Sequence, residues 1–128
     1  MGSTILICDD EPEIRHAMRR TLRDYLVFEA SSAREALDAL KTRAFDAIIS
    51  DFSMGGGADG LDLLQLAKVE YPEMVRFLVT GNRDLDVAVR AVNEGAVHRY
   101  FLKPWNDDQL RAALEIVLHS RNPARRRE

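Results

Sequence analysis

The stretch Thr4-Ile5-Leu6-Ile7-Cys8-Asp9-Asp10-Glu11-Pro12 joins a short, unbroken apolar run to a cluster of acids and a proline. An unbroken apolar run of this length is typical of a strand that is covered on both faces, as in a parallel sheet. Pro12 suits the first position of a helix, because the N–H that proline lacks would have no intrahelical partner there. The stretch therefore predicts a buried strand, an acidic turn and a helix.

The same succession of an apolar run and a longer amphipathic segment occurs five times along the chain. Ser32 and Glu35, for example, have the spacing of a capping box at the start of the second helix. Five such units predict an α/β protein, a flavodoxin-like doubly wound (βα)5 fold with a parallel five-stranded sheet in the order 2-1-3-4-5. A (β/α)8 barrel is excluded, since it needs about 200 residues or more. The expected strands are 4–8, 26–28, 47–49, 77–79 and 100–102.

The composition is that of an ordinary globular domain. Of the 128 residues, 46% are hydrophobic and 30% are charged, which argues against disorder. The formal net charge of −3 gives no reason to expect direct contact with nucleic acid. The single cysteine indicates a reducing compartment, and no apolar run reaches the length of a membrane span. We expect a cytoplasmic protein with one domain over 1–120, and a polar, basic tail or linker over 121–128.

Reactive polar residues follow the predicted strands at the edge where open parallel sheets bind their ligands. A ligand set made of carboxylate oxygens, with no Cys or His in it, favours Mg²⁺ (or Mn²⁺) over zinc. With such a cation, an amine would help to neutralise a phosphoryl group, a hydroxyl would bind it, and a carboxylate could attack phosphorus. The carboxylates are Asp9 and Asp10 after the first strand and Asp51 at the end of the third, the hydroxyl is that of Thr80, and the amine is that of Lys103.

From Thr4 to about His119, the chain resembles the receiver domains of two-component response regulators. The resemblance is carried by four motifs in this order: Asp9-Asp10, Asp51-Phe52-Ser53-Met54, Thr80-Gly81 and Tyr100-Phe101-Leu102-Lys103-Pro104. It implies that Asp51 is the phospho-acceptor, that Lys103 pairs with the phosphoryl group, and that the Lys103–Pro104 bond is cis. It also implies a switch pair, which consists of Thr80 and Tyr100.

The resemblance implies a magnesium pocket as well. Asp10 would bind the ion directly, and Asp9 would often act through a water molecule. Asp51 and the backbone carbonyl of Ser53 would complete the set of protein ligands.

The function implied is that of a signalling phospho-acceptor in a phosphorelay, which assists its own phosphotransfer and dephosphorylation and is not otherwise an enzyme. The phosphoryl donor would be a sensor histidine kinase, a phosphotransfer protein or a small acyl phosphate. The signal would pass to an output domain or a partner protein through the face formed by the fourth helix, the fifth strand and the fifth helix. No contact with nucleic acid or with a membrane is expected.

The chain departs from the family pattern in the loop after Asp51. Gly55 occupies the position where receivers usually have proline, and the segment up to Gly60 is one residue longer than usual. Three consecutive glycines, 55–57, are expected to soften this loop, which bears on kinase docking and phosphoryl lifetime. The stretch 100–105 is more similar to receivers fused to signalling enzymes, such as cyclic-dinucleotide phosphodiesterases, or to kinases.

Three alternative functions stay open. A haloacid-dehalogenase-type phosphatase also uses an aspartate nucleophile and Mg²⁺, but it would have a second acid where this chain has Ser53. A flavodoxin-like redox protein shares the fold, but it would have a phosphate-binding loop in place of Asp9-Asp10-Glu11. The third alternative is a degenerate receiver that only scaffolds its partners, against which the intact acceptor site argues.

Overall fold

The computed structural model describes residues 2–54, 59–81 and 84–120, in which strands and helices alternate. Five parallel strands form one sheet in the predicted order, β2-β1-β3-β4-β5, so the doubly wound (βα)5 fold is confirmed. The strands are β1 (Thr4–Cys8), β2 (Leu26–Ala30), β3 (Ala47–Asp51), β4 (Val75–Thr80) and β5 (Arg99–Leu102). The helices are α1 (Pro12–Thr21), α2 (Ala33–Thr42), α3 (Asp59–Glu70), α4 (Leu85–Asn93) and α5 (Asp107–Ser120).

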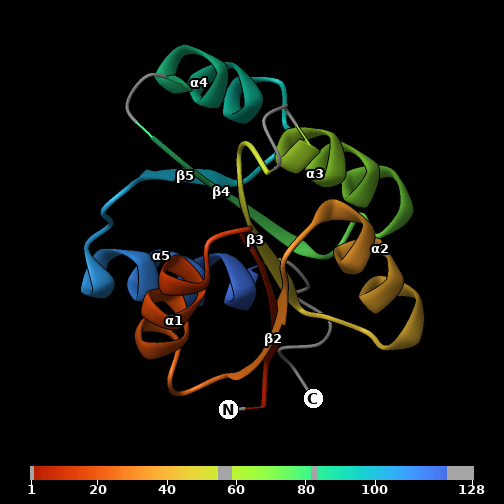
Figure 1. The fold of residues 1–128 in the computed structure, drawn as a ribbon. Coiled ribbons are helices and arrows are strands. Elements are labelled where there is room, and N and C mark those ends of the chain that lie inside the picture. The colour runs from red at the N-terminus through yellow and green to blue at the C-terminus, as the bar shows by residue number, and fades with distance from the viewer. Residues whose placement is uncertain (1, 55–58, 82–83, 121–128) are drawn as a thin grey trace.

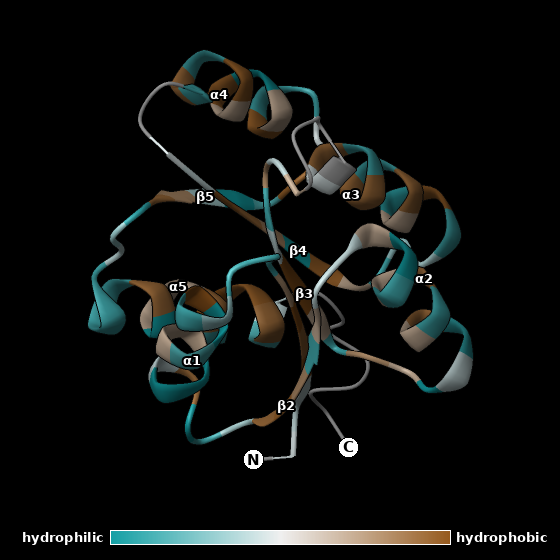
Figure 2. Ribbon diagram, in the orientation of Figure 1, coloured by the Kyte–Doolittle hydropathy of each residue, from teal (hydrophilic) through white to brown (hydrophobic). Residues whose placement is uncertain are grey.

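Helices cover both faces of the sheet (Figure 1). Successive side chains of a strand point to opposite faces, so Ile5 and Ile7 enter one hydrophobic cluster while Leu6 and Cys8 enter the other. The first cluster lies under α1 and α5, and the second lies under α2, α3 and α4. Figure 2 shows the apolar residues along the strands and on the helix surfaces turned toward them. The sheet is therefore buried on both faces, and only its ends are available for polar chemistry.

Two of the strands are longer than their apolar runs because each contains a charged residue. β2 includes Glu29, and β4 includes Arg76, which is 5% exposed. The Arg76 guanidinium donates from Nε to the carbonyl oxygen of Ala96 at 2.8 Å and from Nη1 to that of Met74 at 2.9 Å. These hydrogen bonds compensate for its burial and join the two loops that flank β4 and β5.

Several local backbone signals are found where the sequence indicates them. Pro12 is the first residue of α1, and Gly95 follows α4 with a φ of 79°, a conformation that favours glycine. The Lys103–Pro104 peptide bond is cis, as the family resemblance implies. Among the described helices, none has the length and apolar character needed to cross a bilayer. The expected glycine-rich loop at 55–57 and the expected tail at 121–128 lie outside the described residues.

Candidate functional site

Three carboxylates from two neighbouring strands meet at the carboxyl edge of the sheet. β1 and β3 are paired so that Cys8 lies opposite Ser50, which brings the residues after them, Asp9 and Asp51, side by side. One carboxylate oxygen from each of Asp9, Asp10 and Asp51 lies within 4.8 Å of the other two. Oxygen atoms at this separation can bind one cation together.

Asp9 is buried, and its backbone N–H, its backbone carbonyl and both of its carboxylate oxygens are hydrogen-bonded. Its backbone N–H donates to the carbonyl of Ala30 at 3.1 Å, and its carbonyl accepts from Arg15 Nη1 at 2.7 Å. Its Oδ1 accepts from the backbone N–H of Glu11 at 2.9 Å, and its Oδ2 accepts from Lys103 Nζ at 3.0 Å. Asp9 thus shapes the turn before α1 and faces the site with a carboxylate that is already oriented. Asp10, by contrast, is exposed.

The Lys103 ammonium reaches the acids from the loop that follows the edge strand β5. Its Nζ lies 3.0 Å from Asp51 Oδ1, 3.0 Å from Asp9 Oδ2 and 3.7 Å from the Glu11 carboxylate. Burial lowers the pKa of Lys103, but the hydrogen bonds with Asp51 and Asp9 and the negative charges of these acids together raise it above its ordinary value. The ammonium therefore stays charged and offsets part of the negative charge of the pocket.

The burial and the nearby acids shift the pKa of Asp51. Burial raises the pKa of Asp51 to about 6 against the lowering effect of Lys103, and the charges of Asp9 and Asp10 add to the increase. Its side chain is 11% exposed, so it can still be reached from solution. Because the pocket holds more negative charge than one ammonium offsets, and because its donors in the described residues are carboxylates, it fits a magnesium ion.

Thr80 and Tyr100 lie on the next two strands. Thr80 ends β4 and is fully buried, with its hydroxyl oxygen 3.3 Å from the carbonyl oxygen of Gly81 and 3.4 Å from a carboxylate oxygen of Asp84. The hydroxyl is thus engaged at the start of α4. Tyr100 of β5 pairs with Leu78 of β4 and is half-buried against the cluster under α4.

Ser53 lies two residues beyond Asp51 and is half-buried. A bond from its backbone carbonyl to a metal stays a prediction, as do the roles that the resemblance implies for the other site residues. The structure brings together Asp9, Asp10, Asp51 and Lys103, and it places Thr80 at the end of the adjacent strand.

The sequence did not reveal how closely Gly60 approaches the site. A Cβ on Gly60 would lie 1.6 Å from the backbone carbonyl oxygen of Asp51, and its N–H donates to the carbonyl of Phe52 at 3.0 Å. Only glycine therefore lets the start of α3 pack against the end of β3. The sequence signal for this contact is a glycine soon after Asp51, which the sequence pattern assigns to the loop and not to the helix.

The sequence also did not reveal what fastens the loop that carries Lys103. Trp105 Nε1 donates to the hydroxyl of Thr21 at 2.9 Å, and that hydroxyl lies 2.6 Å from a carboxylate oxygen of Asp107. The end of α1 thus holds both the loop after β5 and the start of α5. Such a contact between distant segments leaves no periodic signal in the sequence.

Comparisons with known proteins identify the family of the chain. The chain matches the family model of the response regulator receiver domain over residues 5–115. It is 39% identical over 126 residues to the alginate biosynthesis transcriptional regulatory protein AlgB of Pseudomonas aeruginosa, which covers 97% of this chain and 28% of that protein. It is 36% identical over 109 residues to the hydrogenase transcriptional regulatory protein HoxA of Cupriavidus necator, which covers 84% of this chain and 22% of that protein.

A solved structure shows the same similarity in three dimensions. The signal receiver domain of an HD domain-containing protein from Pseudomonas fluorescens Pf-5 superposes with a TM-score of 0.86 and 34% identity, over 98% of this chain and 93% of that one. The chain spans about a quarter of the length of the curated relatives named above. Because the family model matches most of its residues, the chain belongs to the receiver-domain family of the response regulators.

Proposed function

We propose that this receiver domain accepts a phosphoryl group on Asp51 and changes its contacts with a partner as a result. The supporting observation is the meeting of Asp51 with two other acids and with Lys103, whose ammonium lies 3.0 Å from it. Of the three acids, Asp51 is the one that ends a strand, and its carboxylate is partly open to solution.

Asp9, Asp10 and Asp51, with the backbone carbonyl of Ser53, would hold Mg²⁺ or Mn²⁺. When bound, the ion supplies positive charge that offsets the charge on the oxygens of the incoming phosphoryl group. The role of the acids is to fix the position of the ion relative to the attacking oxygen of Asp51.

The transfer itself needs a deprotonated carboxylate as the nucleophile and positive charge beside the phosphoryl oxygens. An oxygen of Asp51 attacks phosphorus, a P–O bond forms, and the bond from phosphorus to the donor breaks, with the electron pair leaving on the donor. Lys103 favours the charged form of Asp51 before the reaction and pairs with a phosphoryl oxygen after it. A phosphohistidine of a histidine kinase or of a phosphotransfer protein, or an acyl phosphate, fits as the donor.

The response would begin at Thr80. Its hydroxyl would leave Gly81 and Asp84 and bond to the phosphoryl group, and Tyr100 would turn into the space that Thr80 vacates. Moving such an equilibrium from 1:99 to 99:1 takes about 5.5 kcal/mol. A few charge-assisted hydrogen bonds of about 1.5–3 kcal/mol each can provide it.

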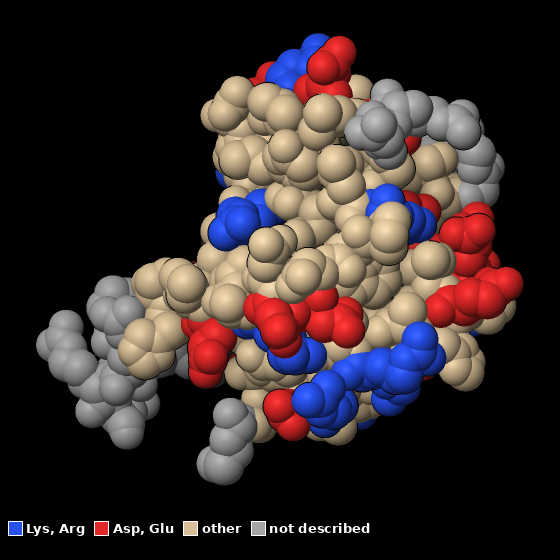
Figure 3. Space-filling view, turned by 90° about the vertical axis from the view of Figure 1, so that its left-hand side faces the viewer, with Lys and Arg blue, Asp and Glu red and all other residues tan. Residues whose placement is uncertain are grey.

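The surface that would change is formed by α4, β5 and α5. It belongs to the side of the molecule drawn in Figure 3, where mostly uncharged side chains lie below the top of the molecule and groups of Lys or Arg side chains lie among them. Val92, Tyr100, Leu102 and Trp105 line a hollow in this surface, together with Arg99 and the polar side chains of Asn106 and Gln109. A partner that places apolar side chains in the hollow and an acidic group beside Arg99 suits it.

Receiver domains are signalling domains, and the relatives named above are longer regulators. We propose that 1–120 serves as the receiver and that 121–128 is a tail or a linker toward an output module. AlgB and HoxA are transcriptional regulators by name, whereas the solved receiver from Pseudomonas fluorescens comes from an HD domain-containing protein. The output module therefore has at least two precedents among similar proteins.

Intact-mass measurement after incubation with acetyl phosphate and Mg²⁺ tests the proposed acceptor. We expect the wild type to gain one phosphoryl unit, Asp51→Asn to gain none, and a metal chelator to prevent the gain. Asp62→Asn is the matched control, because Asp62 is an exposed acid on α3, and it should gain mass as the wild type does. Equal labelling of Asp51→Asn and the wild type would place the acceptor elsewhere.

A further inference from the structure

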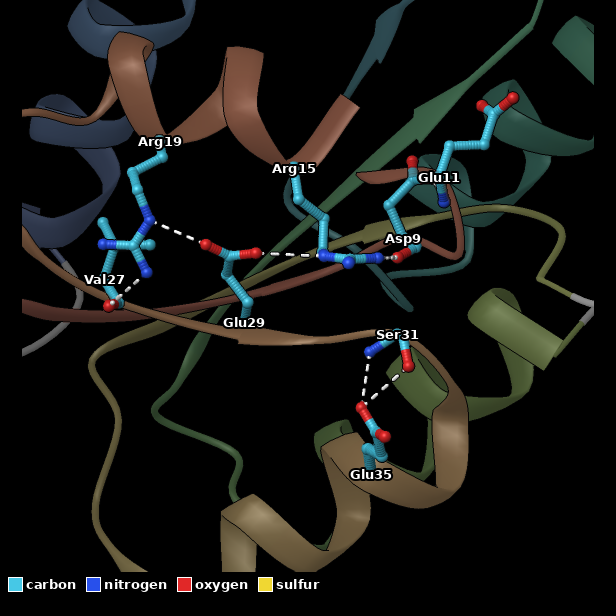
Figure 4. Close-up of polar contacts among 8 residues, drawn as sticks. All are labelled: Asp9, Glu11, Arg15, Arg19, Val27, Glu29, Ser31 and Glu35. Atoms are coloured by element: carbon cyan, nitrogen blue, oxygen red, sulfur yellow. Dashed lines mark hydrogen bonds and ion pairs between the residues drawn. The ribbon is translucent and has the colours of Figure 1, made fainter. Parts of the chain in front are cut away.

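Arg15 connects the acid pair to β2 through one planar guanidinium (Figure 4). Its Nη1 donates to the backbone carbonyl of Asp9 at 2.7 Å, and its Nε donates to Glu29 Oε1 at 3.0 Å. The side chain of Arg15 is 17% exposed and that of Glu29 is 29% exposed, so both lie partly within the protein. Arg15 thus spans α1, β2 and the turn that follows β1.

Arg19, one turn later on α1, bonds to the same carboxylate but is more exposed, with 51% of its side chain accessible to solvent. Its Nε donates to Glu29 Oε2 at 2.7 Å, but its Nη2 reaches the carbonyl of Val27 at 3.2 Å, away from the acid pocket. The hydrogen bond from Arg19, together with that from Arg15, lowers the pKa of Glu29 despite its partial burial. Glu29 therefore holds both arginines as a carboxylate, and only one of the two arginines touches the acid pair.

The carbonyl that Arg15 binds belongs to the peptide unit between Asp9 and Asp10. Because a peptide unit is planar, fixing its carbonyl oxygen also fixes the N–H of Asp10. That constraint sets ψ of Asp9 and φ of Asp10, and so sets the direction in which the two side chains leave the backbone. The Asp9 carboxylate is held in addition by the backbone N–H of Glu11 and by the Lys103 ammonium, while the exposed side chain of Asp10 leaves the backbone on the other side of the peptide that Arg15 binds.

We propose that Arg15, oriented by Glu29, is a positioning residue of the metal pocket. It holds the peptide between Asp9 and Asp10 in the orientation that turns both carboxylates toward one divalent cation. This inference rests on the proposed function, since it concerns the pocket that would hold Mg²⁺ there. It adds a residue that contacts neither the ion nor the phosphoryl group.

Charge and position predict opposite effects on metal binding, which makes the inference testable. As a nearby positive charge, Arg15 would repel a divalent cation, so loss of its charge alone would strengthen binding. Loss of its hold on the peptide would weaken binding. Arg15→Lys keeps the charge but replaces the planar fork with a single ammonium, which cannot occupy both acceptors with the same geometry.

The experiment is a titration with Mn²⁺, in which electron paramagnetic resonance counts the free ion, followed by competition with Mg²⁺. Arg15→Lys should raise the dissociation constant about tenfold, at the lower end of the effect of residues that orient metal ligands. Arg19→Lys is the matched control, because it loses an equivalent bond to Glu29, and its dissociation constant should stay within about twofold of the wild type. Unfolding in urea without metal measures how far each variant is destabilised, so that a loss of Mn²⁺ affinity can be separated from a loss of stability.

Glu29→Gln supplies a second, independent variant. It should weaken Mn²⁺ binding less than Arg15→Lys does, and the double variant should bind no more weakly than Arg15→Lys alone, because both changes act through one contact. If Arg15→Lys and Glu29→Gln bind Mn²⁺ as tightly as the wild type, or more tightly, the inference is overturned and the proposed function still stands. A wild type that binds no Mn²⁺ would overturn both.

Discussion

The Lys103 ammonium lies 3.0 Å from Asp51 Oδ1, although β4 separates the strands from which these two residues come. The long lysine side chain therefore reaches across the end of β4 to the acid that ends β3. The same ammonium also lies 3.0 Å from Asp9 Oδ2, so one cation is shared between two of the three acids of the pocket. A metal ion that enters the pocket must compete with it.

Lys103→Met should separate metal binding from phosphoryl transfer. We expect Mg²⁺ to bind several-fold more tightly, because the acids lose a competing positive charge. We expect the initial rate of phosphoryl uptake to fall by at least about tenfold, because a phosphoryl oxygen loses its charged partner. A Mg²⁺ titration and time-resolved intact mass measure the two quantities. Lys68→Met, on the exposed side of α3, is the control and should change neither; parallel losses of Mg²⁺ affinity and rate in Lys103→Met would contradict the prediction.

Asp51→Asn should stabilise the metal-free protein in a pH-dependent way. The pKa of Asp51 is raised to about 6 by burial and by the neighbouring acids, so the native state binds this proton more tightly than the unfolded chain does. The ionised group therefore costs stability above that pKa, and the cost disappears as the pH falls toward the unfolded value of about 3.9. We expect Asp51→Asn to raise the free energy of unfolding by on the order of 2 kcal/mol above about pH 7.

Urea unfolding in the presence of a metal chelator measures this difference across the pH range. The gain should shrink steadily as the pH is lowered through the pKa of Asp51, because the wild type regains the stability that its ionised acid costs. A gain that is the same at neutral and at acidic pH would show that the substitution acts through something other than this ionisation.

Gly60→Ala should damage both the fold and the site. The added Cβ would lie 1.6 Å from the carbonyl oxygen of Asp51, so the start of α3 or the end of β3 must move. We expect a loss of about 3 kcal/mol or more in the free energy of unfolding, together with slower phosphoryl uptake. Gly81→Ala is the matched control, because a Cβ there meets no atom of the described residues within 4 Å, and its stability should change by less than about 1 kcal/mol. Equal stability of the two variants would contradict the close approach.

Thr80→Ala should keep the acceptor but lose most of the response. Asp51 should still gain mass, because the hydroxyl of Thr80 is engaged with Gly81 and Asp84 rather than with the acceptor. Backbone amide resonances of α4 and Tyr100 should shift much less on addition of Mg²⁺ and beryllofluoride than they do in the wild type. Thr80→Ser retains the hydroxyl and should restore the shifts, whereas full shifts in Thr80→Ala would refute the coupling.

The order of the sheet could be predicted because it depends on local patterns and on the handedness of the connections. The ends of β2 and β4 could not, because Glu29 and Arg76 interrupt the apolar runs. Glu29 is paired with arginines of α1, and Arg76 is bound by carbonyls of two loops. Partners of this kind come from distant parts of the chain and cannot be inferred from hydrophobic spacing.

A similar limit applies to the cap of α2 and to the site. Ser32 Oγ accepts from the backbone N–H of Glu35 at 3.1 Å as predicted, but the Glu35 carboxylate accepts from the backbone N–H and the hydroxyl of Ser31 instead of returning to Ser32. In the site, the acids and Lys103 could be predicted because each directly follows or ends a strand. The hold of Arg15 on the Asp9 carbonyl could not, because it depends on how α1 packs against β2.

The position of a phosphoryl analogue tests the central claim most directly. A crystal structure with Mg²⁺ and beryllofluoride should show beryllium bonded to a carboxylate oxygen of Asp51, the metal bound between Asp51 and Asp10, and Lys103 bonded to a fluorine atom. Beryllofluoride attached to another residue, or a metal bound without Asp10 and Asp51, would contradict the assignment of Asp51 as the acceptor.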